Sequence, residues 1–119
     1  MSTPAPLVVS RHTSRGADVL AVSGELDIAT AAAFRAEFAT VRDTLLPTLV
    51  VDLNEVSFMD STGVGMLVAV RRWLLAHGRD LVLACAGGQP VKILRLVGLD
   101  QVCTIVDSAE DRDWAAAGD

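Results

Sequence analysis

Three polar residues near the middle of the chain, Asp60, Ser61 and Thr62, separate two apolar runs and carry the best candidate chemistry. The run before them is short and β-branched, as in a buried strand, and the run after them continues without proline for long enough to form a helix. They therefore lie at a predicted helix N-terminus, where their oxygens can accept unpaired amide hydrogens. Gly63 and Gly65 are expected to let other groups approach the backbone closely. The pattern predicts a hydroxyl presented on an exposed rim.

A catalytic serine would need a general base beside the Ser61 hydroxyl, and the chain contains two histidines. His12 falls in a predicted strand near the N-terminus, and His77 falls at the far end of the predicted helix from Ser61. The sequence contains neither the P-loop nor the dinucleotide-binding glycine motif, and its His and Cys spacings match no metal site. We therefore expect no catalytic residue, no metal and no cofactor.

The segment from Phe58 to Leu67, with the sequence FMDSTGVGML, resembles the signature of anti-sigma factor antagonists, the small soluble members of the STAS family. Gly24-Glu25-Leu26-Asp27, followed by Thr30-Ala31, resembles the other recurring segment of that family. The similarity extends from about Leu7 to Ser108. Because the modified serine of the family follows the aspartate, the resemblance implies that Ser61 is a phosphorylation site.

The resemblance also implies a partner-binding surface around Ser61. If the strand that ends at Gly24 lies beside the one that ends at Leu53, Asp27 and Asp60 share a rim and form an acidic patch. The partner-binding residues implied are Asp27, Asp60, Ser61, Thr62, Gly63, Val64, Gly65 and Met66. Simpler roles remain open, because the Asp60 turn could be an ordinary helix cap, and Asp27 and Glu25 could be a cap and a solvated charge.

The function that the resemblance implies is a bacterial partner switch that regulates transcription. The unphosphorylated chain would bind an anti-sigma factor, which is also an ATP-dependent serine kinase, and so release a sigma factor. Phosphorylation on Ser61 would abolish binding, and a separate PP2C-type phosphatase would reset the switch. Two alternatives remain open: a STAS scaffold for another signalling or transporter complex, and an enzyme or nucleotide-binding protein. For the latter, the sequence offers only glycine-rich turns at Gly63, Gly65, Gly87 and Gly88.

Length and composition restrict these possibilities. The 119 residues predict a single STAS-like domain over 1–119, with an ordered core at about 7–108. A hydrophobic fraction of 51% with 21% charged residues is typical of a globular protein, and no apolar run reaches the roughly 18 to 20 residues of a membrane span. The net charge of −5 argues against a nucleic-acid-binding surface.

Two further features indicate a cytoplasmic protein. The first residues lack the basic region and apolar core of a signal peptide. Cys85 and Cys103 lie far apart in apolar, strand-like segments, which favours buried free thiols over a redox pair.

The predicted fold class is α/β: a mixed sheet of about five strands with helices mainly on one face. The expected strands cover residues 7–12, 17–23, 48–53, 81–86 and 102–106, and the first two form a hairpin. The expected helices run from Asp27 or Thr30 to about Leu45, from 62 to 77, from Gly87 to Gly98, and from Ser108 onward.

The helix expected over 62–77 is apolar over a wider arc than a core-facing stripe requires. Its apolar residues are Val64, Met66, Leu67, Val68, Val70, Trp73, Leu74 and Leu75. The sequence leaves two explanations open, namely a flank that meets a partner and a helix that is deeply buried.

Overall fold

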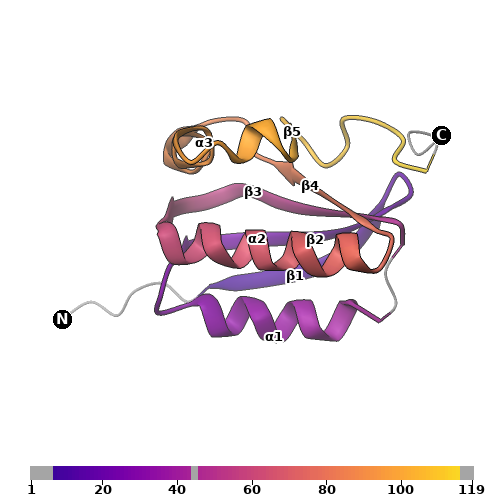
Figure 1. The fold of residues 1–119 in the computed structure, drawn as a ribbon, viewed down its shortest axis with the longest axis horizontal. Coiled ribbons are helices and arrows are strands. Elements are labelled where there is room, and N and C mark those ends of the chain that lie inside the picture. The colour runs from indigo at the N-terminus through magenta and orange to yellow at the C-terminus, as the bar shows by residue number, and fades with distance from the viewer. Residues whose placement is uncertain (1–6, 44–45, 116–119) are drawn as a thin grey trace.

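The structure is a computed structural model that describes residues 7–43 and 46–115. Its single sheet has the order β1-β2-β3-β4-β5 (Figure 1). β1 pairs with β2 antiparallel, and the remaining neighbours pair in parallel. The strands are β1 (Val8–Ser14), β2 (Ala17–Leu26), β3 (Thr48–Met59), β4 (Asp80–Ala84) and β5 (Thr104–Val106). The predicted mixed α/β architecture is confirmed.

Three α-helices cover one face of this sheet. They are α1 (Ala31–Val41), α2 (Ser61–Ala76) and α3 (Gly88–Leu96), and a 3-10 helix (Leu99–Gln101) follows them. α1 and α2 run side by side (Figure 1), with Phe38 of α1 packed edge-to-face on Trp73 of α2. Among the described helices, none combines the length and apolar character that crossing a lipid bilayer requires.

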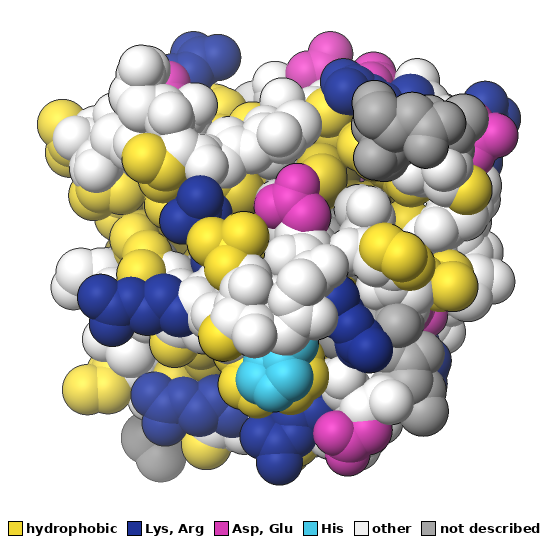
Figure 2. Space-filling view, turned by 45° about the vertical axis from the view of Figure 1, so that its right-hand side comes forward, with side chains coloured by type: hydrophobic (Ala, Val, Ile, Leu, Met, Phe, Trp, Pro, Cys, Tyr) yellow, Lys and Arg dark blue, Asp and Glu magenta, His cyan; other side chains and the backbone are white. Residues whose placement is uncertain are grey.

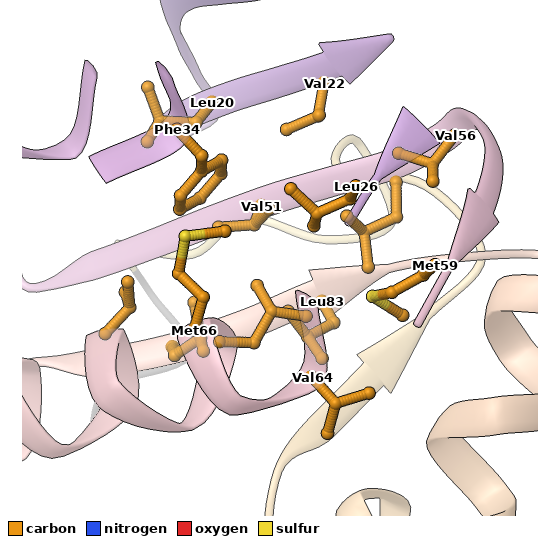
Figure 3. Packing of buried hydrophobic residues seen from close by; sticks show 14 of the residues in the cluster. Leu20, Val22, Leu26, Phe34, Val51, Val56, Met59, Val64, Met66 and Leu83 are labelled. Atoms are coloured by element: carbon orange, nitrogen blue, oxygen red, sulfur yellow. The ribbon is translucent and has the colours of Figure 1, made fainter. Parts of the chain in front are cut away.

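The core lies between the helices and the sheet. Alternate residues of each strand point to opposite faces, so Leu20 and Val22 of β2 face the helices, whereas Val19 faces away from them. Figure 3 shows the helix-facing side chains of β2 and β3 meeting Phe34 and Met66 in a common interior. Burial of these apolar surfaces supplies the main driving force for folding.

The other face of the sheet carries a smaller buried cluster, and the C-terminal segment covers it. Ala109 and Trp114 pack there with residues of β2, β3, β4 and β5. The helix predicted from Ser108 onward is therefore wrong within the described residues, which form turns up to 115. The Trp114 amide donates to Arg15 O at 2.8 Å, and its indole N–H donates to Ala109 O at 2.7 Å. These contacts hold the segment across the sheet in an irregular conformation.

Strand β3 is longer than predicted. The expected strand ended at Leu53 and a loop led to Ser61, but β3 continues to Met59 beside β2. Two register shifts each insert one extra residue into β3, so its buried residues Leu53, Val56 and Met59 lie three apart instead of two. This spacing hides the strand from an argument based on strict alternation.

Helix α1 is shorter than predicted, because it ends at Val41. Leu45, the expected end, lies outside the described residues. The Leu46 amide donates to the buried carboxylate of Asp18 at 2.7 Å, so the chain is held at the start of β2. α2 ends as predicted, with His77 as its C-cap and Gly78 in a left-handed conformation at φ +70°.

Replacement of Trp114 tests whether the C-terminal segment contributes to the core. We expect Trp114→Ala to lower the free energy of unfolding by about 3–5 kcal/mol, because it empties a buried aromatic site. Leu96→Ala is the control, since Leu96 is 85% exposed and its loss should change stability by about 0.5 kcal/mol or less. Urea denaturation measures both. Equal effects of the two substitutions would contradict the packing described for Trp114.

Candidate functional site

The candidate site lies where β2 and β3 leave the sheet together. Leu26 and Met59 are the last paired residues of these parallel strands, so Asp27 and Asp60 emerge next to each other at the same edge. The Asp60 amide also donates to Leu26 O at 3.3 Å. Asp27 and Asp60 therefore share a rim, as expected, and the exposed Glu25 lies on the strand that leads into it.

Asp60 is the N-cap of α2. Its Oδ1 accepts hydrogen bonds from the Thr62 amide at 2.9 Å and the Gly63 amide at 3.1 Å. Its backbone is extended, at φ −109° and ψ −172°, which is typical of a residue that introduces a helix. A carboxylate in this position is also stabilised by the positive end of the helix dipole. Capping is thus a structural role that Asp60 has whether or not a partner binds.

Ser61 is the first residue of α2, and its side chain is exposed. Its hydroxyl forms no hydrogen bond with any side chain or backbone group of the described residues. Thr62 is half-buried. Ser57 is exposed, but its hydroxyl donates a hydrogen bond to Gly24 O at 3.4 Å. Of these three hydroxyls, that of Ser61 is the one that combines exposure with freedom from other contacts.

The second part of the rim is the loop between β2 and α1. The Asp27 carboxylate accepts from the Ala29 and Thr30 amides at 2.9 and 3.2 Å, and the Thr30 hydroxyl donates to Glu25 O at 2.7 Å. Thr30 occupies the N-cap position of α1 without a side-chain capping bond, so Asp27 orders the preceding turn instead. These bonds fix the loop against the end of β2.

Ile28 lies at this loop and was missed by the sequence argument. Its side chain is 79% exposed, between Asp27 and Ala29. Its exposure could have been inferred from its position, because Ile28 precedes the helix and does not belong to the apolar face of α1. An exposed isoleucine beside acidic side chains gives this rim an apolar contact surface as well as charge.

The two glycines of the turn have different roles. A Cβ atom on Gly63 would lie 2.5 Å from Leu26 O and 2.8 Å from Met59 Cγ, so a larger residue cannot occupy this position without movement. Gly63 therefore permits the close approach that was expected. At Gly65 an added Cβ would meet nothing within 4 Å, so no described group of this chain approaches it, and the expected close approach of another group stays a prediction. Gly65 lies one helical turn after Ser61 and leaves the surface beside it open.

The eight predicted partner-binding residues divide by exposure. Asp27, Asp60 and Thr62 are half-buried, and Ser61 and Gly65 are exposed. Gly63, Val64 and Met66 are buried, and Figure 3 shows Met66 directed towards Phe34 in the core. The last three position the turn by packing, and the role of the set in partner binding stays a prediction.

Gln89 is a further residue that the sequence argument missed. Its Oε1 accepts from the Met59 amide at 2.8 Å, and its Nε2 donates to Met59 O at 2.7 Å. A polar residue between Gly88 and Pro90 was the only signal in the sequence. The side chain contacts the residue directly before Asp60.

Comparison with known proteins decides the family. The protein-family model for the STAS domain matches residues 9–111 of this chain. The chain belongs to the STAS domain family. The anti-sigma-F factor antagonist RsfB of Mycobacterium tuberculosis is 30% identical over 111 residues, which cover 93% of this chain and 90% of RsfB. The anti-sigma-B factor antagonist of Listeria monocytogenes is 33% identical over 86 residues, or 71% of this chain and 74% of that protein. The crystal structure of an anti-sigma factor antagonist from Mycobacterium paratuberculosis has a TM-score of 0.83 at 30% identity, and each chain is covered completely.

The apolar arc of α2 in this STAS domain is largely explained by burial. Val64, Met66, Leu67, Val70 and Leu74 are all buried. Trp73 packs against Phe38 at a ring-centroid distance of 5.6 Å, and Leu75 remains 47% exposed. The deeply buried helix is therefore the better of the two explanations.

The histidines of the STAS domain lie away from Ser61. His12 is on the exposed strand β1, and His77 stacks on Trp73 at 3.9 Å between ring centroids. His77 follows the C-terminal end of the 16-residue helix α2, which places it about 24 Å along the axis from the Ser61 end. Within residues 7–43 and 46–115, no cluster of three or more His, Cys, Asp or Glu could hold a metal ion.

The two cysteines are buried and unpaired, as predicted. Burial raises the pKa of the Cys103 thiol to about 11 and also raises the pKa of Cys85. Because the thiolate is the reactive species, both groups are poor nucleophiles near neutral pH.

Charge is distributed unevenly over the surface. Figure 2 shows Lys and Arg side chains gathered around a histidine on the face turned toward the viewer. Arg79, close after the C-terminal end of α2, donates to Arg42 O at 3.1 Å and so lies beside the end of α1. The charged residues of the Ser61 rim described above are instead acidic, namely Glu25, Asp27 and Asp60. A negative group added to Ser61 would enter an acidic environment.

The contrast between the two glycines gives a test of the site geometry. We expect Gly63→Ala to destabilise the protein by about 1–3 kcal/mol, because the new methyl group must displace the Leu26 carbonyl or Met59. Gly65→Ala should stabilise it by about 0.5–1 kcal/mol, because alanine favours an open helical position. Chemical denaturation of the two variants checks both signs. Stabilisation by Gly63→Ala would show that the helix and strand do not approach as described.

Proposed function

We propose that this STAS domain is an anti-sigma factor antagonist whose binding is controlled by phosphorylation of Ser61. The unphosphorylated form binds an anti-sigma factor with serine kinase activity in the cytoplasm and thereby releases a sigma factor. A PP2C-type phosphatase reverses the modification. In this scheme the chain is a ligand and a substrate of other proteins, and it performs no catalysis itself.

The observation that carries the proposal is the Ser61 hydroxyl, which is exposed and free of hydrogen bonds to the described side chains at a carboxylate-capped helix N-terminus. A kinase must bring the hydroxyl into line with a phosphoryl donor, so an accessible and unbonded group is required. The similarity to antagonists such as RsfB over most of the chain supports the choice of partner.

The geometry also supports a local mechanism for the switch. The Thr62 and Gly63 amides already donate to Asp60, so these donors are not free to bind a phosphate on Ser61. The phosphate would remain directed to the surface, where the helix dipole still favours an anion. Phosphorylation should therefore alter the binding surface and leave the packing of the core unchanged.

Electrostatic repulsion is strong enough to act as the switch. Phosphoserine adds about −1.5 to −2 charges at pH 7. An acidic group of the partner about 6 Å away would be opposed by roughly 3 kcal/mol per unit charge at an effective dielectric constant near 20. Even if solvent screening leaves only about 3 kcal/mol in total, the affinity would fall by about two orders of magnitude.

The modified residue can be identified by phosphopeptide mass spectrometry after incubation with ATP and the cognate anti-sigma factor kinase. We expect phosphate on Ser61 and no modification in Ser61→Ala. The variants Thr62→Ala and Ser57→Ala are matched controls and should still be modified, since each removes a neighbouring hydroxyl. Phosphate mainly on Thr62 or Ser57 of the unaltered protein would contradict the assignment.

Two substitutions of Ser61 test whether binding requires the hydroxyl or only the absence of a negative charge. Asp60, not Ser61, caps α2, so Ser61→Ala should change the free energy of unfolding by about 0.5 kcal/mol or less. We expect Ser61→Ala to bind the anti-sigma factor with and without ATP, whereas Ser61→Asp binds weakly. Isothermal titration calorimetry measures both affinities. Failure of Ser61→Ala to bind would mean that the hydroxyl itself is part of the interface.

A further inference from the structure

The last part of β3 lacks a strand neighbour on one side. β3 pairs with β2 as far as Met59, but its pairing with β4 ends at Asp52 opposite Ala84. The residues from Leu53 to Met59 therefore have one strand edge without a β-strand partner among the described residues. Edge groups that are shielded from water must find other hydrogen-bonding partners.

Side-chain hydrogen bonds, in place of strand pairing, join this part of β3 to the neighbouring segments. Asn54 Oδ1 accepts from the Ala86 amide at 2.8 Å, and its Nδ2 donates to Asp107 O at 2.9 Å. At the other end of the unpaired edge, Gln89 donates to and accepts from the backbone of Met59, at 2.7 and 2.8 Å. The carboxamide of Gln89 thus provides Met59 with the acceptor and the donor that a neighbouring strand would have provided.

The position of Gln89 is itself well determined. Gly88 adopts φ +81°, a conformation that other residues rarely reach, and the buried Pro90 follows Gln89 in the first turn of α3. Val91 and Leu94 anchor the same helix in the main core. The Gln89 side chain therefore fixes the end of β3 relative to α3.

We infer that Gln89 is a positioning residue for the Ser61 site, an inference that rests on the function proposed above. Met59 is completely buried and directly precedes Asp60, whose carboxylate holds the first turn of α2. Fixing the Met59 backbone fixes the direction in which Asp60 leaves the strand. Loss of the two Gln89 bonds would leave a buried N–H and a buried C=O unpaired and would loosen the turn that presents Ser61.

The experiment compares Gln89→Leu with Gln101→Leu, a matched control in which an exposed glutamine outside the site undergoes the same change. Amide hydrogen exchange by NMR is measured on the isolated 119-residue chain under conditions in which both variants are folded. We expect exchange of the Met59, Thr62 and Gly63 amides to accelerate by about tenfold or more in Gln89→Leu, the factor expected for loss of a buried hydrogen bond. The control should match the unaltered protein.

Gln89→Glu sharpens the test because a carboxylate can accept from the Met59 amide but cannot donate to Met59 O. It should protect the Met59 amide better than leucine does, while the Thr62 and Gly63 amides remain faster to exchange than in the unaltered protein. A general loss of stability would instead accelerate exchange throughout the core, including amides of β4. Unchanged exchange at Met59 in Gln89→Leu, or uniform acceleration across the sheet, would overturn the inference.

A second measurement connects this position to function. We expect the kcat/KM of the anti-sigma factor kinase for phosphorylation of Ser61 to be about tenfold lower with Gln89→Leu as the substrate. With Gln101→Leu as the substrate it should stay unchanged. If Gln89→Leu loosens the turn but is phosphorylated as efficiently as the unaltered protein, the positioning role is refuted. If the unaltered protein is not phosphorylated, the proposed function fails, and the exchange data still decide whether Gln89 holds the turn.

Discussion

The arrangement of the site depends on the close contact between the start of α2 and the ends of β2 and β3. Gly63 lies so near the Leu26 carbonyl that an added Cβ would be only 2.5 Å away from it. The contact becomes possible because β2 and β3 run parallel and finish together at Leu26 and Met59. Once the helix is seated there, Asp60 can cap it, and Ser61 must point outward from its first turn.

This contact also explains how a rigid scaffold can present a hydroxyl that is open to modification. Met59 and Leu26 are fully buried, whereas Ser61, two residues after Met59, is exposed. The hydrogen bonds that hold the turn use the carboxylates of Asp60 and Asp27 and the side-chain carboxamide of Gln89, and they do not use the Ser61 hydroxyl. A change in the chemistry of Ser61 therefore does not remove an interaction on which the fold depends. The proposed regulation is compatible with the fold for this reason.

The parts of the structure that follow from local chemistry were predictable. Asp60 was expected at a helix N-terminus because its side chain can accept amide hydrogens, and the glycine after His77 was expected to end the same helix. The shared rim of Asp27 and Asp60 was expected from the family resemblance, and the parallel pairing of β2 and β3 agrees with it. The buried residues Phe34, Phe38 and Val41 of α1 recur at the spacing of one helix face, which is a local signal of the same kind.

The parts that depend on contacts between distant residues were not predictable. The continuation of β3 past Leu53 contains two bulges, so its buried residues do not alternate. The bond from Gln89 to Met59 joins residues 30 positions apart, and a single glutamine gives no periodic signal. The final segment was predicted as a helix from its acidic start, but Trp114 instead packs on the far face of the sheet and bonds to Arg15. In each case a tertiary contact outweighed the local preference.

In the proposed switch, a phosphate on Ser61 changes the surface and leaves the fold intact. The most direct test is to prepare the unmodified and Ser61-phosphorylated proteins and to measure, for each, the melting temperature and the affinity for the anti-sigma factor at several salt concentrations. We expect melting temperatures within about 3 °C of each other, an affinity about a hundredfold lower for the phosphorylated form, and a smaller difference in affinity at high salt. A large drop in melting temperature, or an affinity that phosphorylation does not change, would contradict it.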